Sequence, residues 1–314
     1  MRSCSLIAPA KINLYLEIVG DRPDGFHELV MVLQSIALAD RIDLKSLGID
    51  TIRVRCDHPE VPDDETNLAY RAAKLMQEQF PDAFQSHGGT EIIIHKHVPV
   101  AAGLAGGSSN AAAVLVGLDL LWNLGLVHSE LQELGALLGS DVPFCIEGGT
   151  VLATGRGEQL SPLPDLEGFY VVLGKYRDLS VSTASAYKAF REQFRDRYVS
   201  APDDLAARRD RVHSGPLVSA IAHQDRPQIA QELHNDLEKA VLPVYPKVAH
   251  LRQAFVDAGV MAAMMSGSGP TVFGLTESQD AAEQARVAVQ QALDDPQLDL
   301  WVTEFCPTGI CIAP

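Results

Sequence analysis

The chain has 314 residues, which suggests about two domains, and its 46% hydrophobic and 21% charged residues are ordinary for a globular protein. A formal net charge of −16 argues against a broad nucleic-acid-binding face, and no apolar run reaches the about 20 residues that a membrane span needs. Five cysteines without a C-x-x-C pair argue against a disulfide framework and a structural zinc site, so we expect a cytoplasmic protein without a membrane partner.

The first half of the chain alternates short strand-like runs with turn signals. Isoleucine and valine recur in segments that we expect to be strands, at residues 11–20, 41–46, 51–57 and 90–100. Gly20 ends the first of them, and a loop over residues 21–29 follows. Residues 66–80 carry apolar side chains at helical spacing, which predicts a helix with Thr66 or Asn67 as its N-cap.

Residues 98–125, VPVAAGLAGGSSNAAAVLVGLDLLWNLG, place glycines and serines directly before a helix that we expect over residues 109–124, with Asn123 and Gly125 at its end. That helix is apolar nearly all round, which is typical of a central, buried helix. Its first N–H groups have no partner within the helix, and burying each of them unpaired costs about 1–3 kcal/mol. The two serines can cap one or two of them, and the helix dipole favours an anion at the rest.

Glycines suit this loop to phosphate because they permit positive φ and leave no Cβ in the way, as at Gly103, Gly106 and Gly107. The P-loop pattern needs a lysine directly before the serine, where Gly107 stands, and the dinucleotide pattern G-x-G-x-x-G does not fit either. The H-R-D and D-F-G strings of protein kinases are absent. The residues alone therefore predict a phosphate site outside these common folds, with a tightly packed turn as the alternative.

The second half of the chain is richer in helical segments. We expect a short helix over residues 129–139 with Ser129 as its N-cap, turns over 147–160, a strand at 168–174, a helix at 246–259 and a strand at 271–276. Residues 191–216 are crowded with arginine and aspartate, which indicates a solvated insertion or helical excursion without a chemical role. A boundary near residues 155–164 and the clustering of helices favour two α+β domains over a doubly wound parallel sheet.

In the glycine-rich loop, Pro99, Gly103 and Leu104 precede the string AGGSSNAA, which resembles the phosphate loop P-x-x-x-G-L-G-S-S-A-A of the GHMP kinase superfamily. The extra small residues after Leu104 depart from that pattern but are similar to one branch, which acts on a cytidine diphosphate-linked methylerythritol. Three further stretches resemble signatures of this branch: APAKINLYLEIVGDRPDGFHEL, GSDVPF and MSGSGPTVFGL. The resemblance covers nearly the whole chain in the expected order, and residues 191–216 are its poorly matching part.

The resemblance implies an α+β, two-domain GHMP kinase fold, with a mixed-sheet N-terminal domain over residues 1–160 and a ferredoxin-like α/β-plait C-terminal domain over residues 161–314. It implies an enzyme that transfers the γ-phosphoryl group of ATP, carried with Mg²⁺, to the 2-hydroxyl of the methylerythritol unit, in the non-mevalonate route to isoprenoid precursors. We therefore expect a small-molecule substrate, no nucleic-acid partner, and a monomer or weak homodimer.

Two charged residues match the catalytic pair of the family. Asp141, in GSDVPF, matches the aspartate that serves as base, although its surroundings alone would make it an ordinary N-cap or turn residue. Lys11 matches the catalytic lysine. A lysine inside an apolar strand is costly to bury without an anionic partner, and Asp141 would supply one. From its position alone, Lys11 could instead reach solvent from a strand edge.

Four residues match the substrate site. Asn13 lies two residues beyond Lys11 on the same strand face and is expected to orient the substrate. By resemblance, Phe26 and His27 belong to the cytidine site, where an aromatic ring stacks on the base and a histidine bonds its edge. The family often has tyrosine in place of Phe26, a change that keeps the stacking and removes a phenol hydrogen bond. Tyr187 is expected to form the opposite wall, and without the resemblance it would be assigned to the core.

The ATP site is expected to include Asn67 and Lys96 near the adenine, although Lys96, between two histidines, would otherwise be assigned to an exposed strand face. The phosphates are expected on Pro99, Val100, Ala101, Ala102, Gly103, Leu104, Ala105, Gly106, Gly107, Ser108 and Ser109. The loop over residues 267–269 is expected to add backbone donors. No carboxylate can be named as a metal ligand, which leaves Ser108 or Ser109 as the alternative.

Two other interpretations of the resemblance stay open. Another GHMP kinase, acting on homoserine or phosphomevalonate, would share the phosphate loop, but the string GFHEL argues against it. A catalytically inactive, nucleotide-binding protein of the same fold would be expected to lack Lys11 or Asp141, and both are present.

Overall fold

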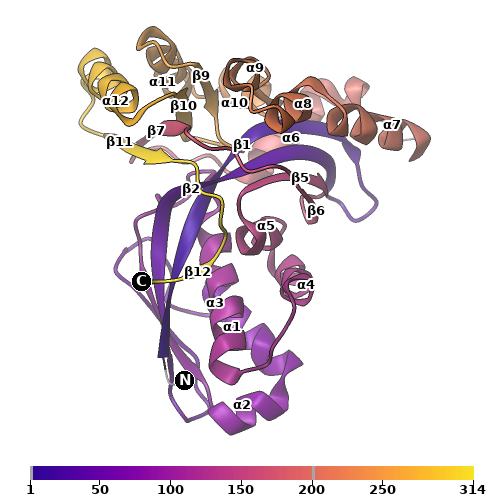
Figure 1. The fold of residues 1–314 in the computed structure, drawn as a ribbon, viewed down its shortest axis with the longest axis vertical. Helices are drawn as coiled ribbons and strands as arrows, with labels where there is room; N and C mark the ends of the chain where they lie inside the picture. Colours follow the sequence, from indigo (N-terminus) through magenta and orange to yellow (C-terminus); the bar gives the residue numbers. More distant parts are fainter. Residues whose placement is uncertain (1–2, 200–201) are drawn as a thin grey trace.

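In the computed structural model, which describes residues 3–199 and 202–314, the chain is organised around one long antiparallel hairpin (Figure 1). Its two strands are β1 (Ser3–Asp21) and β2 (His27–Ser46). They pair from Ser3 opposite Lys45 to Asp21 opposite His27, with irregularities that interrupt the register at three places. The strands predicted at residues 11–20 and 41–46 are confirmed, and both are parts of longer strands that pass through the whole molecule (Figure 1).

A mixed sheet is built on this hairpin. Over the described residues it contains eight strands, with the path β12-β1-β2-β4-β3, and with β5 and β6 attached through β2 and β8 attached to β1. The added strands are β3 (Arg53–Cys56), β4 (Thr90–His95), β5 (Thr150–Gly155), β6 (Gln159–Pro162), β8 (His234–Asn235) and β12 (Cys311–Ile312). The pairs β3–β4 and β1–β8 are parallel and the other pairs are antiparallel, so the expected mixed sheet is confirmed.

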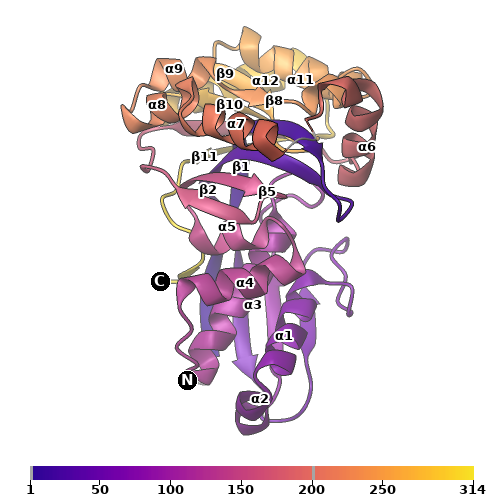
Figure 2. The same ribbon diagram turned by 90° about the vertical axis from the view of Figure 1, so that its right-hand side faces the viewer.

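Helices cover one face of this sheet (Figure 2). They are α1 (Leu68–Gln79), α2 (Pro81–His87), α3 (Gly106–Trp122), α4 (His128–Leu138) and α5 (Val142–Glu147). The α3 helix is the central one, as its apolar composition predicted, and a Cβ added at Gly117 would lie only 2.2 Å from the Leu44 side chain on β2. The absence of a side chain there lets α3 lie directly on the sheet.

Two predicted helix ends need correction. The α3 helix begins at Gly106, three residues before the predicted start, so two glycines and Ser108 belong to its first turn and not to the loop. The α4 helix has Val127 as its N-cap instead of Ser129, and the Glu130 side chain accepts from the Val127 N–H at 2.9 Å. At the other end of α3, Asn123 has the left-handed conformation expected of a helix end, with φ 55°.

A second sheet holds four antiparallel strands over the described residues, in the order β11-β7-β10-β9. These strands are β7 (Tyr170–Tyr176), β9 (Ala262–Met265), β10 (Val272–Thr276) and β11 (Leu298–Glu304). Two helices, α11 (Pro246–Asp257) and α12 (Gln279–Leu293), pack against this sheet, giving an α/β two-layer arrangement (Figure 1). The predicted strands at 168–174 and 271–276 and the predicted helix at 246–259 are confirmed to within a few residues.

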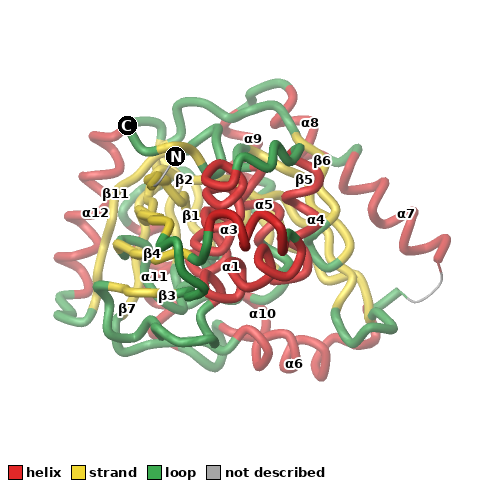
Figure 3. Tube along the Cα trace, turned by 90° about the horizontal axis from the view of Figure 1, so that it is seen from below, coloured by secondary structure: helices red, strands yellow, loops and turns green. Residues whose placement is uncertain are grey.

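The remaining helices lie at the edge of the molecule, where α6 and α7 are outermost (Figure 3). They are α6 (Thr183–Phe194), the 3-10 helix η1 (Arg195–Arg197), α7 (Pro202–His213), α8 (Pro216–Ala222), α9 (Arg226–Gln231) and α10 (Glu238–Val241). The arginine- and aspartate-rich segment at 191–216 is therefore a helical excursion over its described residues. It is tied to β1, because Arg208 donates to the buried Glu17 carboxylate at 2.7 Å.

The chain crosses between the two sheets more than once. After the predicted division at residue 160, β8 and β12 return to the first sheet and pair with β1. The division into residues 1–160 and 161–314 stays a prediction. Within the described ranges, none of the helices has both the length and the apolarity to cross a membrane.

Candidate active site

A cavity of about 990 Å³ opens where β1, the loop before α3 and the N-terminus of α6 meet. The predicted site residues line this cavity, except Ser109 and, in the predicted loop over residues 267–269, Gly269. Ser109 is fully buried, and its hydroxyl donates to the Pro9 carbonyl at 2.7 Å, so this side chain ties α3 to β1 and lies away from the cavity.

The loop over residues 99–105 has an unusual backbone. Ala101, Gly103 and Ala105 all have positive φ, at 50°, 74° and 56°. For alanine this conformation is strained, whereas glycine adopts it freely. A Cβ at Gly103 would also lie 2.3 Å from the Ser266 carbonyl oxygen, so this position has no space for any side chain. The loop is held in one conformation by its contact with the second half of the chain.

This backbone presents the N-terminus of α3 to the cavity. The N-cap is Ala105, which has no side-chain acceptor, and neither of the serines predicted to cap the helix does so. The N–H groups of Gly106, Gly107 and Ser108 therefore have no partner within the helix. A Cβ added at Gly107 would meet nothing nearer than Leu68, at 3.8 Å, so the approach to these donors is open. Three such N–H groups at the positive end of a buried helix can bind an anion.

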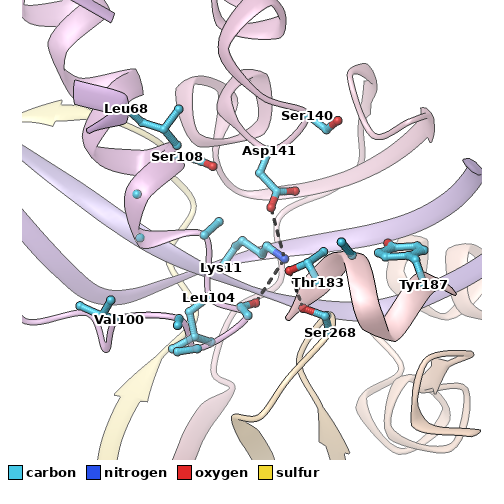
Figure 4. A pocket seen from close by; sticks show the side chains of 18 of the residues that line it. Lys11, Leu68, Val100, Leu104, Ser108, Ser140, Asp141, Thr183, Tyr187 and Ser268 are labelled. Atoms are coloured by element: carbon cyan, nitrogen blue, oxygen red, sulfur yellow. Dashed lines mark hydrogen bonds and ion pairs between the residues drawn. The ribbon is translucent and has the colours of Figure 1, made fainter. Parts of the chain in front are cut away.

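Lys11 and Asp141 face each other across this site (Figure 4). The Lys11 Nζ atom donates to Asn13 Oδ1 at 2.8 Å and to the Gly103 carbonyl at 3.3 Å, and it lies 3.8 Å from Asp141 Oδ2. The Lys11 side chain is only 6% exposed, so the alternative in which it reaches solvent is wrong. Asp141 occupies the N-cap position of α5 but makes no capping hydrogen bond, which leaves its carboxylate available to the cavity.

The predicted loop at residues 267–269 lies beside the glycine-rich loop, and its Gly267 and Ser268 line the cavity. The Ser266 hydroxyl donates to the Gly103 carbonyl at 3.1 Å. Asn235 was not predicted, and its amide donates to the Met265 and Gly267 carbonyls, both at 2.8 Å. Thr183 was also missed, and its hydroxyl lies 2.9 Å from that of Ser268 (Figure 4).

At the adenine end predicted from the resemblance, Lys96 is buried and not on an exposed face. Its ammonium pairs with Asp40, which is fully buried on β2 and was not predicted. The Asp40 carboxylate also accepts from the N–H groups of His97 and Val98 at 2.7 and 2.9 Å, and from Asn110 Nδ2 at 2.7 Å. Asp40 could have been found from the sequence, because a carboxylate within an apolar run must have partners.

Asn67, the other residue predicted at this end, is the N-cap of α1. Its side-chain oxygen accepts from the Ala69 N–H at 2.8 Å, and its amide donates to the Pro62 carbonyl at 2.6 Å. The predicted helix start is therefore confirmed, and the same residue lines the cavity.

At the opposite end of the cavity, the ring of Tyr187 stacks on that of His27, with centroids 5.1 Å apart and an interplanar angle of 16°. Tyr187 thus lines the cavity and contacts His27 directly. Burial raises the pKa of the Tyr187 phenol. Phe26 is 49% exposed, and the guanidinium of Arg156, another residue that was not predicted, lies 5.2 Å from the centre of its ring.

The charges around the cavity oppose those of the whole chain. Among the described residues that line it, five are basic and two are acidic, although the net charge of the chain is −16. The basic residues are Lys11, Lys96, Arg156, Lys188 and Arg191, and the acidic ones are Glu60 and Asp141. Such a local excess of positive charge attracts anionic ligands against the overall field. Within the described ranges, no cluster of three histidine, cysteine or acidic side chains could hold a metal ion.

Comparison with known families places this geometry in context. Residues 67–149 match the N terminal domain of GHMP kinases, and residues 217–295 match the GHMP kinases C terminal domain. Among solved structures, the chain is similar to a 4-(cytidine 5'-diphospho)-2C-methyl-D-erythritol kinase, with a TM-score of 0.73 and 32% identity over 96% of this chain and 98% of the other. A homoserine kinase from Cytophaga hutchinsonii has a TM-score of 0.77 at 20% identity, with 100% and 98% covered, which indicates a shared fold.

Two relatives are much more similar in sequence. A 4-diphosphocytidyl-2-C-methyl-D-erythritol kinase from Nostoc punctiforme is 64% identical over 311 residues, which cover 99% of this chain and 98% of the relative. A protein of the same name from Trichodesmium erythraeum is 61% identical over 313 residues, covering 100% of both chains.

Proposed function

The chain belongs to the GHMP kinase family, and we propose that, like its relatives, it is a 4-diphosphocytidyl-2-C-methyl-D-erythritol kinase. It transfers the γ-phosphoryl group of ATP to the 2-hydroxyl of that substrate, in the methylerythritol phosphate route to isoprenoid precursors. The observation that carries this proposal is a single cavity in which the Lys11–Asp141 pair lies between an open helix N-terminus and a wall of aromatic side chains.

In the proposed reaction, the ATP phosphates bind the N–H groups at the start of α3 and the positive end of its dipole. Asp141 accepts the proton of the 2-hydroxyl, and Lys11 stabilises the negative charge that develops on the oxygen. That oxygen forms a bond to the γ-phosphorus as the bond to the β-phosphate bridging oxygen breaks, and ADP leaves. Asn13, bonded to Lys11 Nζ, orients both the lysine and the substrate.

We propose that ATP binds together with Mg²⁺, which would supply charge neutralisation at the phosphates. A metal ion carried by ATP fits the described residues better than a resident metal ion, since no cluster of three histidine, cysteine or acidic side chains is present among them. The Ser108 hydroxyl in the first turn of α3 is the protein group that would contact the metal.

At the other end of the cavity, Phe26, His27 and Tyr187 bind the cytosine base. Rings of this kind stack on any pyrimidine, and the histidine adds a hydrogen bond to the base edge. We further propose that the protein is cytoplasmic, acts as a monomer or weak homodimer, and has neither a nucleic-acid nor a membrane partner.

The test is a coupled assay of ADP release with ATP and each of three alcohols: 4-diphosphocytidyl-2-C-methyl-D-erythritol, homoserine and phosphomevalonate. We expect turnover with the first substrate and none above background with the other two. Turnover of homoserine or phosphomevalonate with the cytidyl substrate ignored would refute the proposal, and so would the absence of turnover with all three.

A further inference from the structure

The side-chain amide of Asn235 holds the main chain of the loop over residues 265–269. Its Nδ2 atom donates to the Met265 and Gly267 carbonyls, both at 2.8 Å, and its Oδ1 atom accepts from the Leu237 N–H at 3.0 Å. Two carbonyls can be bonded only by a donor, so these partners determine the orientation of the amide. Asn235 is 4% exposed and lies in β8, where it is paired with Leu16 of β1.

Gly267 lies against Lys11 and its neighbours. Its φ is 55°, and a Cβ added there would lie 3.3 Å from Asn13 Oδ1, 3.3 Å from the Gly103 carbonyl oxygen and 3.5 Å from Lys11 Nζ. The main chain of the loop therefore runs beside the ammonium. Among the described residues, the Asn235 amide is the hydrogen-bond partner found for the Gly267 carbonyl, and no hydrogen bond joins that carbonyl to Lys11.

The ammonium of Lys11 has three donors, and two of them are used. They go to Asn13 Oδ1 at 2.8 Å and to the Gly103 carbonyl at 3.3 Å. Asp141 Oδ2, at 3.8 Å, is beyond hydrogen-bond distance, so the third donor is left for an oxygen of a ligand. In the proposed reaction this oxygen belongs to the alcohol. A carbonyl that reached Lys11 would take the donor that the reaction requires.

The loop has the freedom to deliver such a carbonyl. Rotation of the peptide group between Gly267 and Ser268 changes the backbone angles of Gly267, and glycine tolerates a wide range of them. Without the Asn235 amide, the Gly267 carbonyl would lose its partner, and an unpaired buried carbonyl is unfavourable. The ammonium beside it is a charged donor, which forms stronger hydrogen bonds than a neutral one.

We propose that Asn235 is a positioning residue whose amide holds the Gly267 carbonyl and thereby keeps the third N–H of Lys11 free for the alcohol oxygen. This inference rests on the proposed function, because it takes Lys11 to act on that oxygen. Asn235 is not among the residues that line the cavity, and it acts through Gly267 alone.

The first experiment measures steady-state kinetics with ATP and the cytidyl substrate. Asn235→Ala should lower kcat by about tenfold, as for the loss of one oriented hydrogen bond. KM for ATP should be nearly unchanged, because the N-terminus of α3 is untouched. If Asn235→Ala does not fold, Asn235→Ser replaces it, since a serine hydroxyl keeps a donor for one of the two carbonyls. An unchanged kcat, or an equal rise in KM for ATP, overturns the proposal.

Two control variants separate positioning from stability. Thr271→Val removes from the same segment a buried hydroxyl that has no hydrogen-bond partner among the described residues, and it should leave kcat unchanged. Val289→Ala removes buried methyl groups from α12, which does not line the cavity, so it should lower the melting temperature and leave kcat unchanged. A loss of kcat in Val289→Ala as large as that in Asn235→Ala would assign the effect to stability and overturn the proposal.

The second experiment asks whether the effect passes through Lys11. In a Lys11→Met background the Gly267 carbonyl has no ammonium to bind, so adding Asn235→Ala should change the residual rate by less than about twofold. A loss as large as that in the wild-type background overturns the inference and leaves the proposed function standing.

A crystal structure of Asn235→Ala tests the geometry without an activity assay. We expect the Gly267 carbonyl to lie within hydrogen-bond distance of Lys11 Nζ. A carbonyl that keeps its wild-type orientation overturns the proposal. If the wild-type protein turns over none of the three alcohols, the proposed function fails, and the orientation of the carbonyl in this crystal structure alone decides whether Asn235 positions Gly267.

Discussion

The two ends of the cavity are built in different ways. At the proposed phosphate end, the main chain supplies the groups expected to bind the ligand: a strained loop, an open helix N-terminus and a glycine against which Ser266 packs directly. At the proposed base end, side chains supply these groups, and they project from the hairpin turn and from the peripheral helix α6. Phe26 is half exposed there, whereas Asp40 at the predicted adenine end is fully buried.

We interpret this difference as a division between binding of ATP, which every kinase of the fold requires, and recognition of one particular substrate. A triphosphate is the same in all of them, so it can be bound by main-chain donors, which substitutions other than to proline leave in place. A base must be distinguished from other bases, and only side chains present distinct donors and acceptors. We therefore expect substitutions at the proposed phosphate end to affect stability and nucleotide binding, and substitutions at the proposed base end to affect substrate specificity.

The largest expected effect lies between the two ends. Asp141→Asn removes the proposed base and should lower kcat by about 10²–10⁴-fold. The Kd for ATP should be nearly unchanged, because the Asp141 carboxylate is not part of the α3 N-terminus at which the phosphates are proposed to bind. Steady-state rates and calorimetric titration with ATP measure the two quantities. Near-normal turnover would remove Asp141 as the base.

The next effect concerns the buried Lys96–Asp40 pair at the predicted adenine end. Asp40→Asn leaves Lys96 buried without a counter-ion and should lower the free energy of unfolding by about 3–5 kcal/mol. Asp299→Asn, at the exposed pair with Arg177, is the control and should cost at most about 1 kcal/mol. Urea denaturation measures both, and equal losses in the two variants would contradict the contrast between buried and exposed pairs.

The attachment of the segment that follows β8 to β1 should depend on pH. Burial alone would raise the pKa of Asp236, but hydrogen bonds from His234, Lys239 and the Ile18 N–H outweigh it and lower the pKa from 3.8 to about 2. A depressed pKa stabilises the folded state above pH 3.8, and that contribution is lost as pH falls toward 2. Asp236→Asn should therefore cost roughly 2 kcal/mol at pH 6, and the difference should vanish near pH 2. A cost that is independent of pH would exclude this origin.

Gly103 tests the close approach of the two halves of the chain. Gly103→Ala places a Cβ 2.3 Å from the Ser266 carbonyl at a φ of 74°, and should cost about 1–3 kcal/mol of stability. Gly107→Ala is the matched variant, since its Cβ meets nothing nearer than 3.8 Å, and it should not be destabilised. Thermal unfolding compares the two, and equal melting temperatures would show that the loop can shift.

The smallest effect on stability is expected at the base end. Phe26→Ala removes a half-exposed ring and should change the free energy of unfolding by no more than about 0.5 kcal/mol. It should raise KM for the cytidyl substrate by about tenfold through lost stacking, with KM for ATP unchanged. An equal rise in both KM values would mean that the two ends are not independent.

The sequence was most informative where a physical requirement was local. The apolar surface of the helix after residue 105 predicted both its central position and its need for a ligand at the N-terminus. Its start was misplaced by three residues because glycine and serine are poor helix formers, yet they are tolerated in a first turn that the loop geometry already determines.

Contacts between distant segments were less predictable. Lys11 and Asp141 lie 3.8 Å apart, but only the resemblance indicated that they meet, because nothing in either segment specifies the other. Asn235, in β8, and Thr183, the first residue of α6, carried no signal at all, since a polar side chain is ordinary in the sequence until the fold brings it to a carbonyl or another hydroxyl. Asp40 was visible in principle, as a buried acid always requires donors.

The Gly103 carbonyl accepts both from the Lys11 ammonium and from the Ser266 hydroxyl. One oxygen of the phosphate loop is thus shared between the lysine proposed to act on the alcohol and the loop of the second half. A ligand that shifts this loop would alter the hydrogen bonding of Lys11, and we therefore expect the affinity for the nucleotide and the affinity for the alcohol to be thermodynamically linked. Reciprocity then requires that each ligand change the binding constant of the other by the same factor.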